Sequence, residues 1–117
     1  MKLKRKLEAQ QTLHRLTWRR YVREGSRPNG SHWMERAFLC IHSHEGAWTS
    51  NTGNGYYGGM QMDTSFQRAY GPEFLRAWGT ANNWPISVQL AVSMRAYLSG
   101  RGFYPWPNTA RYCGLIG

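Results

Sequence analysis

The stretch CIHSHEGAWTSNTGNGYYGGMQM, residues 40–62, joins the end of a helix to a segment that cannot continue it. Upstream, apolar residues recur at helical spacing on one face and predict a helix that starts near Ser31 and fades between residues 43 and 46. The residues on that face are Trp33, Ala37, Phe38 and Ile41. Residues 49–59 hold four glycines among Asn, Thr and Ser, a composition that favours short strands and tight turns. We therefore expect a small glycine-rich β-hairpin after the helix.

Downstream of this hairpin the local signals predict three more helices. Asp63 is well placed to cap a short helix over residues 64–70, and Pro72 suits the first position of another over residues 72–78. Apolar residues recurring every four positions predict a longer helix over residues 85–99. This pattern is carried by Ile86, Leu90, Met94 and Leu98. The tail after it is expected to be irregular, with one or two helical turns.

Charge divides the 117-residue chain into two parts. Residues 1–30 contain nine basic and two acidic side chains, a net charge of +7, whereas the remainder carries only +2 of the total +9. Fifteen of the seventeen aromatic residues lie after residue 30. This boundary predicts a cationic helical arm and linker over residues 1–30 and one packed domain over residues 31–117.

A basic arm attracts a polyanion such as nucleic acid, anionic lipid or a cell-wall polymer. The domain behind the arm is weakly charged and shows no groove-reading motif, which disfavours nucleic acid. The arm is expected either to bind an anionic polymer, to dock the chain onto a larger assembly, or to be a solvated helix. No run of about 18 apolar residues predicts a membrane span. The first residues lack the apolar core of a signal peptide, so the chain as written carries no export signal.

Few carboxylates are available for catalysis, and only Glu45 and Asp63 lie in a suggestive setting. The others are Glu8, Glu24, Glu35 and Glu73, which are expected to be solvated or to lie in first helical turns. Glu45 follows a helix end close to Trp48, where partial burial would raise its pKa toward that of a general acid. An ordinary charged loop residue is the alternative. For Asp63, helix capping is favoured over catalysis.

Read whole, the domain resembles the transglycosylase-like domains of actinobacterial secreted proteins, the lysozyme-like group that includes resuscitation-promoting factors. The resemblance covers roughly residues 33–115. It rests on a glutamate before a tryptophan, NTGNGYYGGMQM, SFQRAYG, the long helix with Gln89, and GRGFYPWPNTARYCG. Resuscitation-promoting factors place the glutamate directly after the cysteine, where this chain has Ile41. Glu45 instead matches the sister pattern CIHxxEGxW.

The resemblance implies an α+β, mainly α, lysozyme-like fold with a small glycine-rich β-hairpin and one disulfide. It also implies cleavage of the β-1,4 bond between N-acetylmuramic acid and N-acetylglucosamine in peptidoglycan. Glu45 would act as acid and then as base, giving a 1,6-anhydro product without water. A hydrolase would need a second carboxylate, for which Asp63 is the candidate, or a substrate-assisted route.

The same resemblance implies several substrate-binding residues. Gln61 and Tyr57 match positions that orient sugar and acid, and Tyr56, one residue earlier on an alternating strand, is expected to face away. Three further aromatic residues would either stack on sugar rings or pack in the core. They are Trp48, Tyr104 and Trp106.

Cys40 and Cys113 are the only cysteines, and their number alone leaves a disulfide and two free thiols equally open. The resemblance to secreted proteins favours the disulfide and an extracellular or cell-wall location. His42 and His44 suggest a metal site with Glu45 by residue type. Residues two apart on a helix point about 200° apart, however, so no metal and no cofactor are expected.

A rival class is a non-catalytic module that binds glycan or has a structural role, attached to a larger assembly by its basic arm. The arm and the missing signal peptide motivate this alternative. We favour an enzyme because the acid Glu45, the glycine-rich segment and Gln61 are all present.

Overall fold

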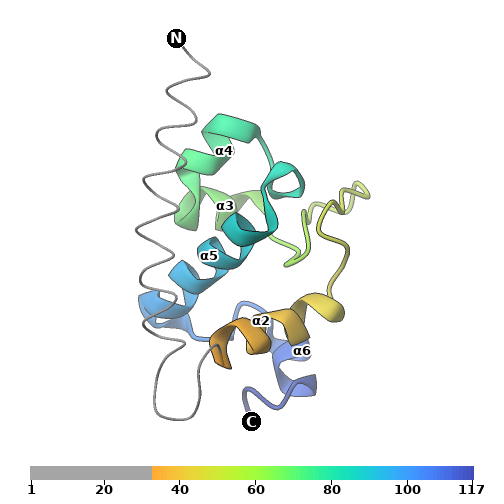
Figure 1. Cartoon of the computed structure of the whole chain (residues 1–117), viewed down its shortest axis with the longest axis vertical. Coiled ribbons are helices and arrows are strands. Elements are labelled where there is room, and N and C mark those ends of the chain that lie inside the picture. Colours follow the sequence, from red (N-terminus) through yellow and green to blue (C-terminus); the bar gives the residue numbers. More distant parts are fainter. Residues whose placement is uncertain (1–32) are drawn as a thin grey trace.

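The computed structural model describes residues 33–117, and in this part short helices pack around a central helix (Figure 1). Their bounds, in chain order, are α2 (Trp33–Ser43), α3 (Thr64–Tyr70), α4 (Pro72–Trp78), η1 (Ala81–Asn83), α5 (Ile86–Ala96), η2 (Tyr97–Arg101) and α6 (Pro107–Tyr112). Helix α5 contacts both α3 and α2, and α2 in turn contacts α6. The predicted arm, residues 1–30, lies outside the described residues, so the division into arm and domain stays a prediction.

Local signals in the sequence account for the boundaries of α3 and α4, which are those expected. The Asp63 carboxylate accepts a hydrogen bond from the Phe66 N–H at 2.8 Å and so caps α3. Pro72 occupies the first turn of α4, where its missing N–H costs nothing. Glu73 in the same turn forms an ion pair with Arg95 of α5, which ties α4 to the central helix.

The central helix differs from expectation at its C-terminal end. The regular α-helix ends at Ala96 and continues as the wider π-helical turn η2. Within this turn Gly100 has a φ of 107°, a conformation that glycine adopts at little cost. The predicted helix over residues 85–99 is therefore present, but its last turn is widened.

The expected β-hairpin does not form as paired strands in the described part of the chain. Residues 51–62 contain two isolated antiparallel bridges, Asn51 to Tyr57 and Tyr57 to Met62. Tight turns with positive φ at Gly53, Gly55 and Gly58 interrupt any longer ladder. This segment, residues 46–62, is called the glycine-rich loop below, and in Figure 1 it projects to one side of the helices.

Long-range hydrogen bonds from α5, rather than strand pairing, fix the glycine-rich loop. The Gln89 side chain is 1% exposed, and its Oε1 accepts the Gly59 N–H at 2.8 Å. Its Nε2 donates to the carbonyl oxygens of Trp48 and Trp84, each at 3.0 Å. A second buried glutamine, Gln67 of α3, similarly joins two other segments through its amide. All polar atoms of the Gln89 amide are thus used to hold the loop against the core.

The close approach of Trp48 to the loop requires a glycine at position 59. A Cβ atom there would lie 2.4 Å from the Trp48 ring and 2.6 Å from His42 Nδ1. The Trp48 ring stacks on the His42 ring of α2, with centroids 3.7 Å apart. Trp48 therefore locks α2 to the glycine-rich loop, which was one of its two expected roles.

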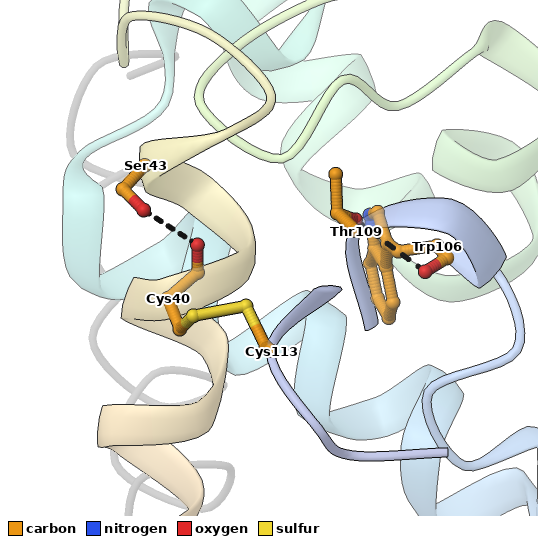
Figure 2. The surroundings of a disulfide bond; sticks show 5 residues. All are labelled: Cys40, Ser43, Trp106, Thr109 and Cys113. Carbon is orange, nitrogen blue, oxygen red and sulfur yellow. Dashed lines mark hydrogen bonds between the residues drawn. A yellow bond between two sulfur atoms is a disulfide. The ribbon is translucent and has the colours of Figure 1, made fainter. Parts of the chain in front are cut away.

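Cys40 and Cys113 form the predicted disulfide, which joins α2 to the end of α6 (Figure 2). The bond closes a sequence separation of 73 residues, nearly the whole described domain. Apolar packing also holds these two ends together, because Phe38 of α2 packs edge-on against Trp106 at the start of α6. Among the described residues, none of the helices is both long and apolar enough to span a membrane.

We predict that Gln89→Met strongly destabilises the fold. The methionine fills similar volume but leaves one N–H and two carbonyl groups unpaired in the interior, which should lower the free energy of unfolding by about 3 kcal/mol or more. Urea unfolding measures the change. Ile86→Ala on the same helix is the control, because Ile86 is 48% exposed and should change stability by about 1 kcal/mol or less. Equal effects of the two substitutions would contradict the role of Gln89.

We also predict that the disulfide contributes a large part of the stability. A closed loop of this length constrains the unfolded chain, so the double variant Cys40→Ala and Cys113→Ala should lose up to about 4 kcal/mol of unfolding free energy. Thiol titration of the oxidised, denatured wild-type chain should find no free thiol. Two titratable thiols, or equal stability of the variant and the wild type, would refute this prediction.

Candidate active site

Glu45 lies just beyond the C-terminal end of α2, as the sequence predicted. Its backbone N–H donates to the His42 carbonyl oxygen at 3.0 Å, so the last turn of the helix fixes its position. The half-buried side chain lines a cavity of about 250 Å³. The other lining residues are Tyr56, Gln61 and Pro105. The glycine-rich loop and the segment before α6 thus form the walls around this carboxyl group.

Two opposing effects set the protonation of Glu45. Burial raises the pKa of its carboxyl group, because the charged form loses hydration. A hydrogen bond from the Thr109 side chain acts in the opposite direction, and burial is the larger effect. Thr109 lies in α6, and Cys113 of the disulfide directly follows that helix. Figure 2 shows a second acceptor for the Thr109 hydroxyl, the Trp106 carbonyl oxygen at 3.4 Å. The pKa of Glu45 therefore lies above its ordinary value, as a general acid requires.

Gln61 lies beside Glu45 in a strained backbone conformation. Its φ of 50° is in the left-handed region, which is uncommon for residues other than glycine. Its side-chain Nε2 donates to the Gly58 carbonyl oxygen at 2.9 Å. A Cβ atom on Gly46 would lie 3.1 Å from the same nitrogen. The absence of a side chain at Gly46, the neighbour of Glu45, therefore gives the Gln61 amide room beside the carboxyl group.

A second cavity, of about 370 Å³, continues from the first. The two share Tyr56, Gln61 and Pro105, and together they form what we call the groove. Asp63 lines the larger cavity and is absent from the lining of the smaller one. Because its carboxylate also caps α3, Asp63 lies in the groove as a structural group, away from the cavity of Glu45.

The structure gathers only some of the predicted substrate-binding residues in the groove. Gln61 and Trp106 line it, and the Trp106 Nε1 donates to the Met60 carbonyl oxygen at 2.8 Å. Tyr57 and Tyr104 line neither cavity. Tyr57 is partly buried against the core, and the Tyr104 side chain is 63% exposed outside the groove. Trp48, stacked on α2, lies outside the lining as well.

The sequence misplaced one groove residue, Tyr56, and missed Thr109, which contacts Glu45 from outside the lining of the groove. Tyr56 lines both cavities, contrary to the expectation that it faces away. That expectation assumed strand alternation, whereas the Tyr56 N–H donates to the Asn54 side chain in a turn. Thr109 was missed because no local signal connects it with Glu45. A link between the C-terminal helix and the acid follows only from the disulfide pairing and the packing of α6 on α2.

The two histidines near Glu45 point to different partners. His42 Nδ1 lies 2.9 Å from the Gly59 carbonyl oxygen, which requires a proton on that nitrogen. The His44 ring packs edge-on against Tyr112, with centroids 4.2 Å apart. His44 also lies within 4.8 Å of the sulfur atoms of Cys40 and Cys113, but these sulfurs are bonded to each other. The histidines therefore do not converge with Glu45 on one metal position.

Comparison with known proteins identifies the family of the chain. Residues 28–109 match the model of a family described as a transglycosylase-like domain. The chain is also 39% identical over 70 residues to resuscitation-promoting factor Rpf1 of Corynebacterium glutamicum. That similarity covers 60% of this chain and 35% of the relative. Since the family model spans well over half of the chain and includes α2, the groove and Glu45, the chain belongs to the transglycosylase-like domain family.

Proposed function

We propose that this domain cleaves the glycan strands of peptidoglycan and that Glu45 is its catalytic acid and base. The observation that carries the proposal is the half-buried Glu45 carboxyl group, with a raised pKa, in a groove shared with Gln61. Membership of the transglycosylase-like family supports the reaction class. A raised pKa favours the protonated carboxyl group, which is the form that can protonate a leaving glycosidic oxygen.

The proposed reaction breaks the β-1,4 bond between N-acetylmuramic acid and N-acetylglucosamine. Protonated Glu45 donates to the glycosidic oxygen as the bond to C1 of the muramic acid breaks. The resulting carboxylate then accepts the proton of the C6 hydroxyl of that sugar, and the hydroxyl oxygen closes on C1. The product is a 1,6-anhydro sugar, Glu45 is protonated again, and no water is consumed.

A mechanism with a single carboxylate fits the composition of the groove. Among residues 33–117, Glu45 is the only acidic residue that lines the smaller cavity. The second carboxylate of the groove, Asp63, is engaged as the cap of α3. Hydrolysis of the lysozyme type uses a pair of carboxyl groups flanking one bond. The arrangement therefore favours the lytic reaction over the hydrolytic one.

Substrate contacts in this proposal come from residues that line the groove. Gln61 is suited to hydrogen bond with the N-acetyl or hydroxyl groups, while Tyr56 and Trp106 offer aromatic surface to sugar rings. Trp48 and Tyr57 act indirectly, by holding the glycine-rich loop in place. Tyr104 remains a predicted contact for glycan that extends beyond the groove.

We also propose that the protein acts outside the cytoplasm or at the cell wall. Its substrate lies there, and the disulfide between Cys40 and Cys113 is of the kind that persists in oxidising compartments. The basic residues 1–30 would add affinity for anionic polymers or for a larger assembly.

Replacing the acid tests the proposed function directly. Glu45→Gln cannot donate the proton and should lower the rate of peptidoglycan cleavage by at least about 100-fold while leaving the fold intact. Asp63→Asn is the matched control, because asparagine also caps helices and should keep nearly wild-type activity. Mass spectrometry of the wild-type digest should find 1,6-anhydro ends. A hydrolase would instead give reducing ends, which are heavier than the 1,6-anhydro ends by one water. If such ends are found and Asp63→Asn also loses activity, the protein is a hydrolase that uses two carboxylates.

Thr109 should tune the pH dependence of the reaction. Its hydrogen bond favours the charged form of Glu45, so Thr109→Val should raise the pKa of Glu45 further. Because the acid acts in its protonated form, the alkaline limb of kcat/KM should move to higher pH. The loss of orientation should also lower kcat by roughly three- to tenfold.

Thr109→Ser is the control for this experiment, because it keeps the hydroxyl group and should restore both the pH profile and the rate. If Thr109 had a purely structural role, Thr109→Val would change the stability of the protein and leave the alkaline limb of the pH profile of kcat/KM in place. An unchanged limb in Thr109→Val would therefore remove the assigned influence of Thr109 on Glu45.

A further inference from the structure

The larger cavity of the groove combines an apolar floor with one cation and one carboxylate, that of Asp63, which caps α3. Phe66, Ala69, Pro105 and Trp106 provide the apolar surface. Arg101 is the only basic residue among the described residues that line either cavity. Since the smaller cavity contains the proposed acid Glu45, a glycan lying along the groove would pass from Glu45 toward Arg101.

Arg101 is held at the wall of this cavity by its neighbours. It ends the η2 turn directly after Gly100, whose φ of 107° redirects the chain. Its guanidinium carbon lies 5.9 Å from the centroid of the Tyr70 ring, and Nη1 lies 3.4 Å from the Tyr70 hydroxyl. Tyr70 also lines the cavity. The tyrosine thus restrains one side of the guanidinium group.

The remaining donors of Arg101 are available for an anionic ligand. A guanidinium group has five N–H donors, of which Tyr70 takes one. Within residues 33–117 Arg101 forms no ion pair, whereas Arg95 is paired with Glu73. Two parallel N–H donors match the two oxygens of a carboxylate, which makes arginine well suited to such a group.

We propose that the larger cavity is a subsite for a sugar bearing a carboxylate, which Arg101 binds. This inference rests on the proposed function, since it places an acidic glycan in the groove. In peptidoglycan the carboxylate has two sources. It is either the free lactyl group of muramic acid or a carboxylate of the peptide stem attached to that group. The apolar floor contacts the sugar, and Arg101 selects acidic glycans over neutral ones.

The test measures binding to the full chain carrying Glu45→Gln, so that it does not depend on cleavage. Three soluble glycans of equal length are compared by calorimetry: one with free lactyl carboxylates, one with these groups converted to amides, and one with peptide stems. Adding Arg101→Gln should weaken binding of at least one carboxylate-bearing glycan by about 10- to 100-fold. Binding of the neutral amide glycan should stay unchanged.

Two controls separate charge recognition from a structural effect. Arg76→Gln removes an exposed charge outside the groove and should leave all three affinities unchanged. In the protein that retains Arg101, higher salt should reduce the difference in affinity between the acidic glycans and the neutral one. In the Arg101→Gln protein, salt should not change this difference. Loss confined to the lactyl glycan or to the stem-bearing glycan identifies the source of the carboxylate.

The inference is overturned if Arg101→Gln weakens all three glycans equally or changes none of them. It is also overturned if the protein that retains Arg101 binds the neutral glycan as tightly as it binds both acidic glycans. These outcomes are distinct from failure of the proposed function. That function fails if the wild-type chain cleaves no peptidoglycan, whatever the binding measurements give.

Discussion

The side-chain amide of Gln89 lies inside the protein and joins α5 to the glycine-rich loop through two hydrogen bonds, while a third binds the Trp84 carbonyl oxygen. A loop without paired strands has little backbone pairing of its own, so its shape depends on partners elsewhere in the chain. Gln89 binds the loop at Trp48 and Gly59, on both sides of the glycine turns. Since Tyr56 and Gln61 lie on the same loop, the walls of the groove depend on an amide that never contacts the substrate site.

The C-terminal part of the chain depends in a similar way on a remote constraint. Helix α6 has only six residues and would not be stable alone. The disulfide to α2 and the packing of Trp106 on Phe38 hold it against the domain. This attachment brings Thr109 to Glu45. The covalent bond and the environment of the proposed acid are therefore two consequences of one contact between α2 and α6.

Local signals in the sequence predicted the helices, because caps and apolar spacing act over a few residues. The Asp63 cap and Pro72 set helix starts that the structure reproduces. The glycine-rich loop was predicted less well, since glycines permit many conformations and distant hydrogen bonds select one. Strand alternation consequently misplaced Tyr56, and Thr109 was invisible without the fold. Of the aromatic candidates far from Glu45 in sequence, Trp106 lines the groove and Tyr104 does not, so residue type suggested candidates that only the packing could separate.

Burial and the Thr109 hydrogen bond shift the pKa of Glu45 in opposite directions. This opposition helps to explain how one carboxyl group can serve in both steps of the proposed reaction. Burial alone would favour the protonated form of Glu45, which suits the first step, in which the group donates a proton. It would also make the carboxylate left after that step costly to form. The Thr109 hydrogen bond stabilises that carboxylate, which must persist until it accepts the second proton. A second acidic residue beside Glu45 would raise the cost of ionisation again. With Asp63 engaged at the cap of α3, no second carboxylate adds to the cost of ionising Glu45, and the opposing effects of burial and the Thr109 hydrogen bond act on one group that serves as acid and base.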